Sequence, residues 1–411
     1  MVKLLVLADD FTGSLDTGVQ FRAKGTRIRF GSPDHRYFDR LDEDIQVLIV
    51  DTESRHLPPD EAAAVVHRVV SDAVAAGVRY IYKKTDSGLR GNIGAELGAA
   101  LKASGKPVLH FIPGYPQIGR TTKNGIQYIK GVPVGESVFA KDPFNPVLHS
   151  AVKDIILSQT DAAVSITGEA LPERGIMVHD AETEEDLTAV AAALKAEDQL
   201  TLLAGCAGFA SVLPELLALE PAEDSLPPFT PRLLTLCGSI NPITLEQLAV
   251  AEAAGMPKIN LTVDQKLRED WLDSPAGQET VAQWSQIIAA HPGTVIDCDG
   301  TSEPEALDAL RTELGLSFEQ MRARIAETMG KILKALLDNG TDATLLITGG
   351  DTLLAGMNRL GQEELIPIRE ISQGVVLSRI RYCGKEYSLL SKSGGFGNTD
   401  LLAQLQAIIC K

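Results

Sequence analysis

The sequence is poor in cysteine and has no long apolar run, and both shortages exclude whole classes of protein. Its five cysteines have no C-x-x-C spacing, so the pattern predicts neither a disulfide framework nor a zinc site and fits a reducing compartment. No apolar stretch is long enough to cross a bilayer, and the start, MVKL, leads into a short strand pattern rather than a signal peptide. We therefore expect a cytoplasmic protein without a membrane partner.

Positive charge is also scarce. Lysine and arginine total 38 against 55 aspartates and glutamates, which gives a net charge of -17. Nucleic acids need a basic surface, so this balance argues against a nucleic-acid partner. It does not argue against a small anionic substrate, because a local cluster of lysines and arginines can overrule the global sign.

Several motifs of common enzyme classes are missing as well. The seven histidines form neither H-x-H nor H-E-x-x-H, so no metal is assigned to them. The absence of G-x-S-x-G disfavours an α/β hydrolase. Neither G-x-x-x-x-G-K-[ST] nor G-x-G-x-x-G occurs, so the chain has no P-loop, and a dehydrogenase with a dinucleotide fingerprint is disfavoured.

Short apolar runs alternate with helical patterns along the 411 residues, which is typical of an α/β chain with mainly parallel sheets. A chain of this length exceeds one ordinary core. The segment 219–232 contains four prolines and no periodicity, so we place a domain boundary there. We predict two α/β domains, 1–225 and 226–411, each with a largely parallel sheet flanked by helices. The strand candidates are 2–8, 45–50, 78–82, 108–112, 200–204, 233–237, 294–297 and 344–348.

Three glycine-containing turns follow apolar runs in the second half of the chain. They are 238–242 (GSINP), 349–352 (GGDT) and 392–397 (KSGGFG), and each precedes a helical pattern. A strand that turns into a helix presents free backbone N–H groups and a positive helix end, which suits phosphate. The alternative is that the glycines merely permit tight turns. Three such turns in one domain favour nucleotide binding.

Acidic and basic side chains follow three strand candidates in the first half. The first strand ends in Asp9 and Asp10, the second is followed by DTESRH at 51–56, and the third by KKTDSGLRG at 83–91. In an open α/β sheet, such strand ends line the ligand crevice. The alternatives are that an aspartate only caps a helix or that a charged turn is simply solvated.

The segment 119–146 has no clear periodicity, and we expect a long loop with a hairpin at 126–134. Arg120 is the second residue of this segment. This arginine, with Arg55 and Arg90, suits the carboxylate of a small hydroxy acid. Asp10 or Asp86 would then accept a proton from a hydroxyl as general base.

Six motifs follow one another in a specific order: ADDFTG at 8–13, KTDSGLRG at 84–91, PGYPQIGR at 113–120, CGS at 237–239, GGDT at 349–352 and KSGGFG at 392–397. Together they resemble the four-carbon acid sugar kinases over nearly the whole chain. The family more often has Thr where Gly88 stands and Glu where Asp351 stands. The first difference removes a hydroxyl near the substrate, and the second shortens the reach of a carboxylate.

The resemblance implies ATP-dependent phosphorylation of the terminal hydroxyl of a four-carbon sugar acid, with Mg²⁺ bridging the phosphates. The active site would lie in the cleft between a sugar-acid-binding and a nucleotide-binding domain. The segment 51–55 favours D-threonate or D-erythronate over a 3-oxo-tetronate. A regulator that binds these ligands without catalysis stays an alternative. The oligomeric state stays open, with a homodimer among the options.

The resemblance also assigns residues. Asp10 or Asp86 is the general base, and the metal ligands stay open. The residues expected to bind the acid are Asp9, Thr12, Arg55, Lys84, Ser87, Arg90 and Arg120. The residues expected to bind ATP are Ser239, Gly349, Gly350, Asp351, Thr352, Gly394 and Gly395.

Overall fold

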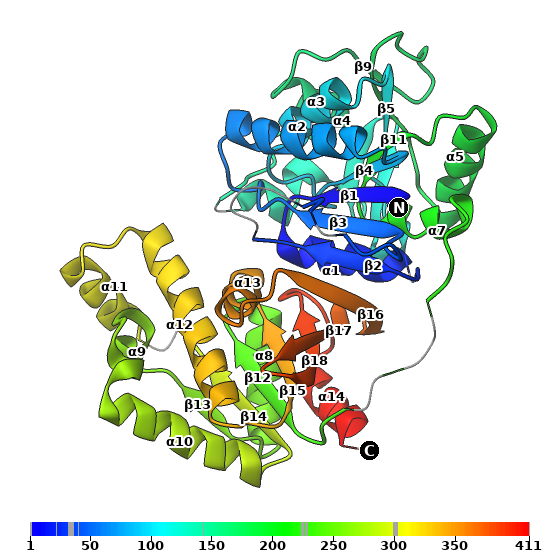
Figure 1. Cartoon of the computed structure of the whole chain (residues 1–411). Helices are drawn as coiled ribbons and strands as arrows, with labels where there is room; N and C mark the ends of the chain where they lie inside the picture. The colour runs from blue at the N-terminus through cyan, green and yellow to red at the C-terminus, as the bar shows by residue number, and fades with distance from the viewer. Residues whose placement is uncertain are drawn as a thin grey trace. The chain divides into compact units, whose positions relative to one another are not determined.

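The computed structural model describes residues 2–21, 23–31, 37–39, 41–142, 144–222, 226, 229–298 and 303–410. The contacts divide the chain into two compact units, Met1–Asp224 and Ser225–Lys411 (Figure 1). Within the proline-rich segment 219–232, residues 223–225 and 227–228 lie outside the described residues. No helix in the described ranges combines the length and the hydropathy that a membrane span requires.

Unit 1 contains a sheet of parallel strands in the order β2-β3-β1-β4-β11-β5-β10-β9. The fully buried strands β1, β3 and β5 match the continuous apolar runs seen in the sequence. The bounds are β1 Leu4–Ala8, β2 Thr26–Arg29, β3 Val47–Asp51, β4 Tyr80–Lys84, β5 Val108–Ile112, β9 Val164–Ile166, β10 Gly175–Val178 and β11 Leu202–Gly205.

Helices cover this sheet. In Figure 1, α2, α3 and α4 lie together above the strands, whereas α1 lies below them and packs against α6 and α7. The bounds are α1 Phe11–Phe21, α2 Pro59–Ala75, α3 Ile93–Ser104, α4 Val152–Leu157, α5 Glu184–Ala196, α6 Ala207–Ala210 and α7 Leu213–Leu216.

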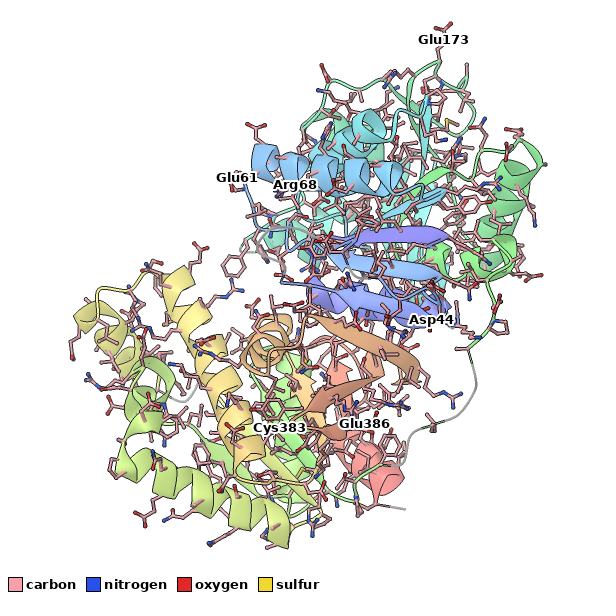
Figure 2. The ribbon with its side chains drawn as sticks, viewed as in Figure 1. Asp44, Glu61, Arg68, Glu173, Cys383 and Glu386 are labelled. Atoms are coloured by element: carbon pink, nitrogen blue, oxygen red, sulfur yellow. The ribbon has the colours of Figure 1, made fainter. Side chains whose placement is uncertain are left out.

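Helix α2 illustrates why these segments are helical. Pro59 occupies the first turn, where its missing N–H costs nothing, and Asp60 and Glu61 favour the positive helix end. Glu61 points away from the helix into solvent (Figure 2). The buried positions repeat at helical spacing and face the core: Ala62, Val66, Val69, Val70 and Ala73.

The aperiodic segment of the first half forms a small antiparallel sheet, with β6 Arg120–Lys123, β7 Ile126–Ile129 and β8 Val132–Pro133. The predicted hairpin is therefore present, and β6 is an additional strand. Both turns are tight: Lys130 and Gly131 have positive φ, as do the two residues between β6 and β7. Two short 3-10 helices follow, Val134–Glu136 and Val138–Lys141.

Unit 2 has a mixed sheet in the order β13-β14-β12-β15-β18-β17-β16. Strands β13, β14, β12, β15 and β18 pair in parallel. Strands β18, β17 and β16 form an antiparallel meander, which the sequence analysis did not predict. The bounds are β12 Leu233–Cys237, β13 Lys258–Asn260, β14 Gly293–Asp297, β15 Thr344–Thr348, β16 Glu364–Ser372, β17 Val375–Tyr382 and β18 Lys385–Lys392.

The helices of unit 2 include a long one, α12, which begins with a capping box between Ser317 and Gln320 and packs along α13. Helix α14 packs against α8. The bounds are α8 Pro242–Ala253, α9 Val263–Leu267, α10 Pro275–Ala290, α11 Pro304–Glu313, α12 Phe318–Asp338, α13 Gly350–Arg359 and α14 Leu401–Ile409.

A buried ion pair lies beneath the strand ends of unit 1. Lys83 Nζ on β4 is 2.9 Å from Glu96 Oε2 on α3, and both side chains are almost completely shielded from solvent. The Ser54 hydroxyl donates a hydrogen bond to Glu96, and Lys83 donates to the carbonyl of Lys84 at 2.8 Å. This network joins β4, α3 and the loop after β3.

Substituting one partner should destabilise unit 1. We expect Lys83→Met to lower its free energy of unfolding by about 3–5 kcal/mol, because the Glu96 carboxylate would stay buried without its cation. The double variant Lys83→Met/Glu96→Gln should recover most of this loss, since no charge is left. The exposed pair Arg79–Asp198 offers a matched control, and Arg79→Met should have almost no effect.

Urea unfolding can assign the effect to one unit. Both tryptophans, Trp271 and Trp284, lie in unit 2, so their fluorescence reports that unit, whereas far-UV circular dichroism reports both. Lys83→Met should shift the circular-dichroism transition and leave the fluorescence transition in place. A double variant as unstable as the single one would contradict the ion-pair account.

Candidate functional site

The register of the parallel strands brings the charged segments of unit 1 to one edge of the sheet. Ala8 pairs with Asp51 on one side and with Lys84 on the other. The loops after β1, β3 and β4 therefore start at the same level. We use the term charged cluster for the six side chains that meet there: Asp9, Asp10, Arg55, Lys84, Asp86 and Arg90.

Arg55 is the centre of the charged cluster. Its Nε donates to Asp9 Oδ2 at 2.7 Å and its Nη2 to Asp10 Oδ1 at 2.6 Å, and Nη2 also lies 3.9 Å from Asp86 Oδ1. The guanidinium is nearly buried. One arginine thus joins acidic side chains that follow two different strands.

Asp9 and Asp10 have different surroundings. Asp9 is buried; burial alone would raise its pKa, but the positive charges of Arg55, Lys84 and Lys83 outweigh burial and hold the pKa well below its usual value. Asp10 keeps a quarter of its side chain exposed (25%). Its Oδ1 also accepts from Gly13 N at 3.2 Å. None of its contacts within the described ranges involves Oδ2.

Lys84 lies between these two carboxylates. Its Nζ is 3.8 Å from Asp9 Oδ1 and 3.6 Å from Asp10 Oδ1. Burial tends to lower the pKa of Lys84, but the charges of Asp10 and Asp9 raise it overall. Gly13 leaves room for this ammonium group, since a Cβ at that position would overlap both Lys84 Nζ and Asp10 Oδ1. Lys84 is therefore a permanent cation of the site.

Asp86 has both oxygens occupied. Its Oδ2 accepts from Arg90 Nε at 2.9 Å and from the backbone N–H of Gly88 and Arg90, while Oδ1 accepts from Arg90 Nη2 at 2.9 Å. Burial would raise the pKa of Asp86, but Arg90 and Arg55 hold it well below its usual value. Arg90 also binds Asp142 Oδ2 at 3.1 Å. This bidentate pair fixes the loop after β4.

Arg120 completes the set of predicted acid-binding arginines. Its Nη1 donates to the Ser87 hydroxyl, and the guanidinium lies over the ring of Phe139. The contacts of Arg120 within the described ranges include no carboxylate, unlike those of Arg55 and Arg90. Thr12 lies in the first turn of α1, half-buried.

The sequence analysis missed residues that support this site. Lys83 and Glu96 lie beneath it, and Asp142 and Phe139 reach it from the aperiodic loop. Lys83 belongs to the charged segment 83–91 of the sequence analysis but was given no role there. It lies within β4, and because successive strand residues face opposite sides, its side chain is on the face opposite to that of Lys84. The loop residues gave no signal in the sequence, because only tertiary packing brings them there.

A cavity of about 550 Å³ adjoins the charged cluster on the side of α3 and α4. It is lined by residues next to Arg55 and Arg90 in the chain, His56 and Gly91, and by the loop that contains Asn145. Its lining includes no member of the charged cluster. The cavity therefore borders the charged cluster but is not lined by its side chains.

In unit 2, the three glycine turns lie side by side. Strand β15 is between β12 and β18, with Cys237 paired with Thr348 and Thr348 paired with Lys392. The turns after these residues consequently share one edge of the sheet. Ser239 contacts the third turn, since a Cβ on Gly394 would lie 2.7 Å from its Oγ.

The turn after β15 presents an uncapped helix end. Gly349, the N-cap of α13, has φ 105° and no side chain, so the helix has no side-chain cap. The first backbone bond within α13 comes from Leu353, which donates to the Gly349 carbonyl. Within the described ranges, the N–H groups of Gly350, Asp351 and Thr352 are thus left for another partner.

Two predicted nucleotide-binding side chains have protein partners here. Asp351 is exposed and pairs with Arg322 Nη2 on α12 at 2.9 Å. Thr352 is buried, and its Oγ1 fills the space beside Gly238. The described ranges contain no cluster of three or more histidine, cysteine, aspartate or glutamate side chains able to hold a metal ion.

The third turn differs from its prediction. It does not open directly into a helix, because α14 begins only at Leu401. Lys392 is buried, and its Nζ donates to the carbonyls of Ser393 and Gly394 and to Thr244 Oγ1. Burial lowers the pKa of Lys392 to about 8. Thr244 also donates to the Gly394 carbonyl at 2.8 Å, which fixes this turn against α8.

Comparisons with known proteins agree with both halves of the molecule. Residues 4–213 match the family model of the sugar-binding N-terminal domain, and residues 234–402 match that of the nucleotide-binding C-terminal domain. A crystal structure of a Haemophilus influenzae protein has the same fold, with a TM-score of 0.72 and 21% identity over 98% of this chain and 100% of that one.

Curated relatives extend over the full length. The D-threonate kinase of Salmonella typhimurium is 32% identical over 98% of this chain and 97% of that protein. The D-threonate kinase of Bordetella bronchiseptica is 30% identical over 97% and 95%. A D-erythronate kinase from Heliobacterium modesticaldum is 24% identical over 97% and 95%. These matches confirm the resemblance, and the chain belongs to the four-carbon acid sugar kinase family.

Proposed function

We propose that this kinase transfers the terminal phosphoryl group of ATP to the 4-hydroxyl of D-threonate or D-erythronate, with D-threonate preferred. The observation that carries the proposal is the charged cluster, in which Arg55 holds one oxygen of Asp10 and leaves the other open. The preference for D-threonate rests on the two relatives of that name at 32% and 30% identity. A 3-oxo-tetronate kinase is 26% identical, so this activity is the alternative.

Asp10 is the better general base of the two aspartates. A base needs an oxygen that can take a proton, and Asp10 Oδ2 is not engaged within the described ranges, whereas both oxygens of Asp86 accept hydrogen bonds. The low pKa of Asp86 also disfavours protonation. Asp86 instead positions Arg90. Arg55 and Lys84 both lie at the other oxygen of Asp10, Oδ1.

Arg120 is the best anchor for the carboxylate of the acid. The guanidinium groups of Arg55 and Arg90 already bind carboxylates of the protein, so a substrate would have to compete with them. Arg120 donates to the neutral Ser87 hydroxyl instead. Through Ser87, Arg120 lies beside the loop after β4, which starts at the same level as the loop that carries Asp10.

Unit 2 offers the features that a triphosphate needs. Phosphate oxygens fit the free N–H groups at the start of α13, where the helix end is positive. The neighbouring turns with Ser239 and Gly394 would bind through their backbone. Mg²⁺ would neutralise phosphate charge and keep mostly water and phosphate ligands.

These assignments give a simple mechanism. Arg120 orients the acid, Asp10 takes the proton of the 4-hydroxyl, and the hydroxyl oxygen attacks the terminal phosphorus in line with the leaving ADP. The amides of α13 hold the phosphates in position. Because the hydroxyl and the phosphate must meet, the proposal requires the acid bound by unit 1 and the nucleotide bound by unit 2 to come together during the reaction.

The substrate is tested by a coupled ADP-release assay over D-threonate, D-erythronate, L-threonate and 3-oxo-tetronates. We expect D-threonate to give the highest kcat/KM, and phosphorus NMR should place the phosphate on the C4 oxygen. A higher kcat/KM with a 3-oxo acid would replace the proposed substrate. The absence of ADP release with every acid would refute the kinase reaction proposed.

The two aspartates should respond differently. Asp10→Asn is expected to lower kcat by about 10²–10⁴-fold, because the side chain can no longer take a proton. An amide oxygen can still accept from Arg55, so the site should otherwise stay in place. Asp86→Asn should chiefly raise KM, since Arg90 loses its bidentate partner. Steady-state kinetics measures both, with exposed Asp154→Asn on α4 as control. Near-wild-type kcat for Asp10→Asn would exclude the assignment of Asp10 as base.

One backbone amide can be removed from the helix end. Proline at the first helical position lacks the N–H but fits a helix, so Gly350→Pro deletes a single donor. We expect the Kd of ADP–Mg²⁺ to rise about 10–100-fold, the scale of a hydrogen bond to a charged group. Gly350→Ala keeps the N–H and is the matched control. Equal affinities of the two variants in calorimetry would rule out phosphate binding there.

A further inference from the structure

Phe139 joins two arginines of the acid site. It lies in the 3-10 helix Val138–Lys141, and its ring centre is 5.1 Å from the guanidinium carbon of Arg90 and 5.1 Å from that of Arg120. The ring therefore contacts both cations by cation–π interaction. One ring thus contacts two like charges, one from the loop after β4 and one from the start of β6.

The loop holds this ring in a defined place. Phe139 N donates to Ser137 Oγ at 3.2 Å, and Val147 N donates to the Phe139 carbonyl at 3.1 Å. Asp142, three residues on, binds Arg90. The segment is thus tied to the site at two points, and the ring is only partly exposed.

Gly88 provides the space for the ring. Its backbone does not lie in the left-handed region, so the conformation does not require glycine. A Cβ at this position would lie 3.0 Å from both Cδ atoms of Phe139 and 3.0 Å from Asp86 Oδ2, closer than ordinary contact. The absent side chain at 88 and the ring at 139 are therefore complementary.

We propose that Phe139 is a specificity-determining residue of the acid site. Its ring fills the space over Gly88 and fixes the guanidinium of Arg120. This inference rests on the proposed function, in which Arg120 binds the carboxylate of the acid. The position of this anchor relative to Asp10 determines the length and configuration of acid that places a hydroxyl at the base. The ring thereby selects among four-carbon acids.

The test compares kcat/KM for D-threonate, D-erythronate and L-threonate in variants of residue 139. Phe139→Leu should raise KM for D-threonate by about tenfold, within the range of a cation–π contact, and change the ratio of kcat/KM between the acids at least about fivefold. Phe139→Tyr keeps the ring and should retain the wild-type ratio. Val138→Ala, at an exposed neighbour, is the control.

A second perturbation approaches the same contact from Gly88. Gly88→Ala should raise KM because its methyl group presses on the ring and on Asp86 Oδ2. In the double variant, Phe139→Leu should restore the part of binding that is lost through the ring. Unchanged ratios in Phe139→Leu, with an active wild type, would overturn this inference alone. A wild type that releases no ADP with any acid would overturn the proposed function and this inference together.

Discussion

The charge balance around Arg55 is the constraint on which the acid site depends. Asp9 is buried next to the sheet, and a buried carboxylate without a partner costs several kcal/mol. Arg55 meets that demand and at the same time holds Asp10 in one orientation. The loops after β1 and β3 must therefore keep this geometry, and electrostatics rather than apolar packing positions the candidate base.

Each unit carries its candidate site at the carboxyl ends of its own parallel strands, but the two sites suit different chemistry. In unit 1, the carboxyl ends of parallel strands carry side-chain charges, which suit a small acid with few atoms to recognise. In unit 2, they carry glycines and an uncapped helix, which suit phosphates through backbone N–H groups. On the proposed function, selectivity in the first unit would depend on side chains, whereas nucleotide binding in the second would depend mainly on chain conformation.

The sequence predicted the central strands well because residues buried on both faces form continuous apolar runs, as β1, β12 and β15 do. Strands β2, β13 and β16 are half-exposed and lack such a run. The apolar run before the third glycine turn lies in β18, but its antiparallel pairing with β17 was not predicted. The charged segments were predicted from their place after strands. The contact of Phe139 with Arg120 was not, because no local pattern connects a loop residue to a distant arginine.

The charged groups at the acid site also bear on what happens after transfer. With Asp142 and Arg120 included, its four carboxylates face four cations, so the described site is close to neutral before any ligand arrives. A sugar acid adds one negative charge, but its phosphorylated product adds about −1.5 to −2 more. The four cations of this group are already matched by its carboxylates, so mutual repulsion would favour departure of the product.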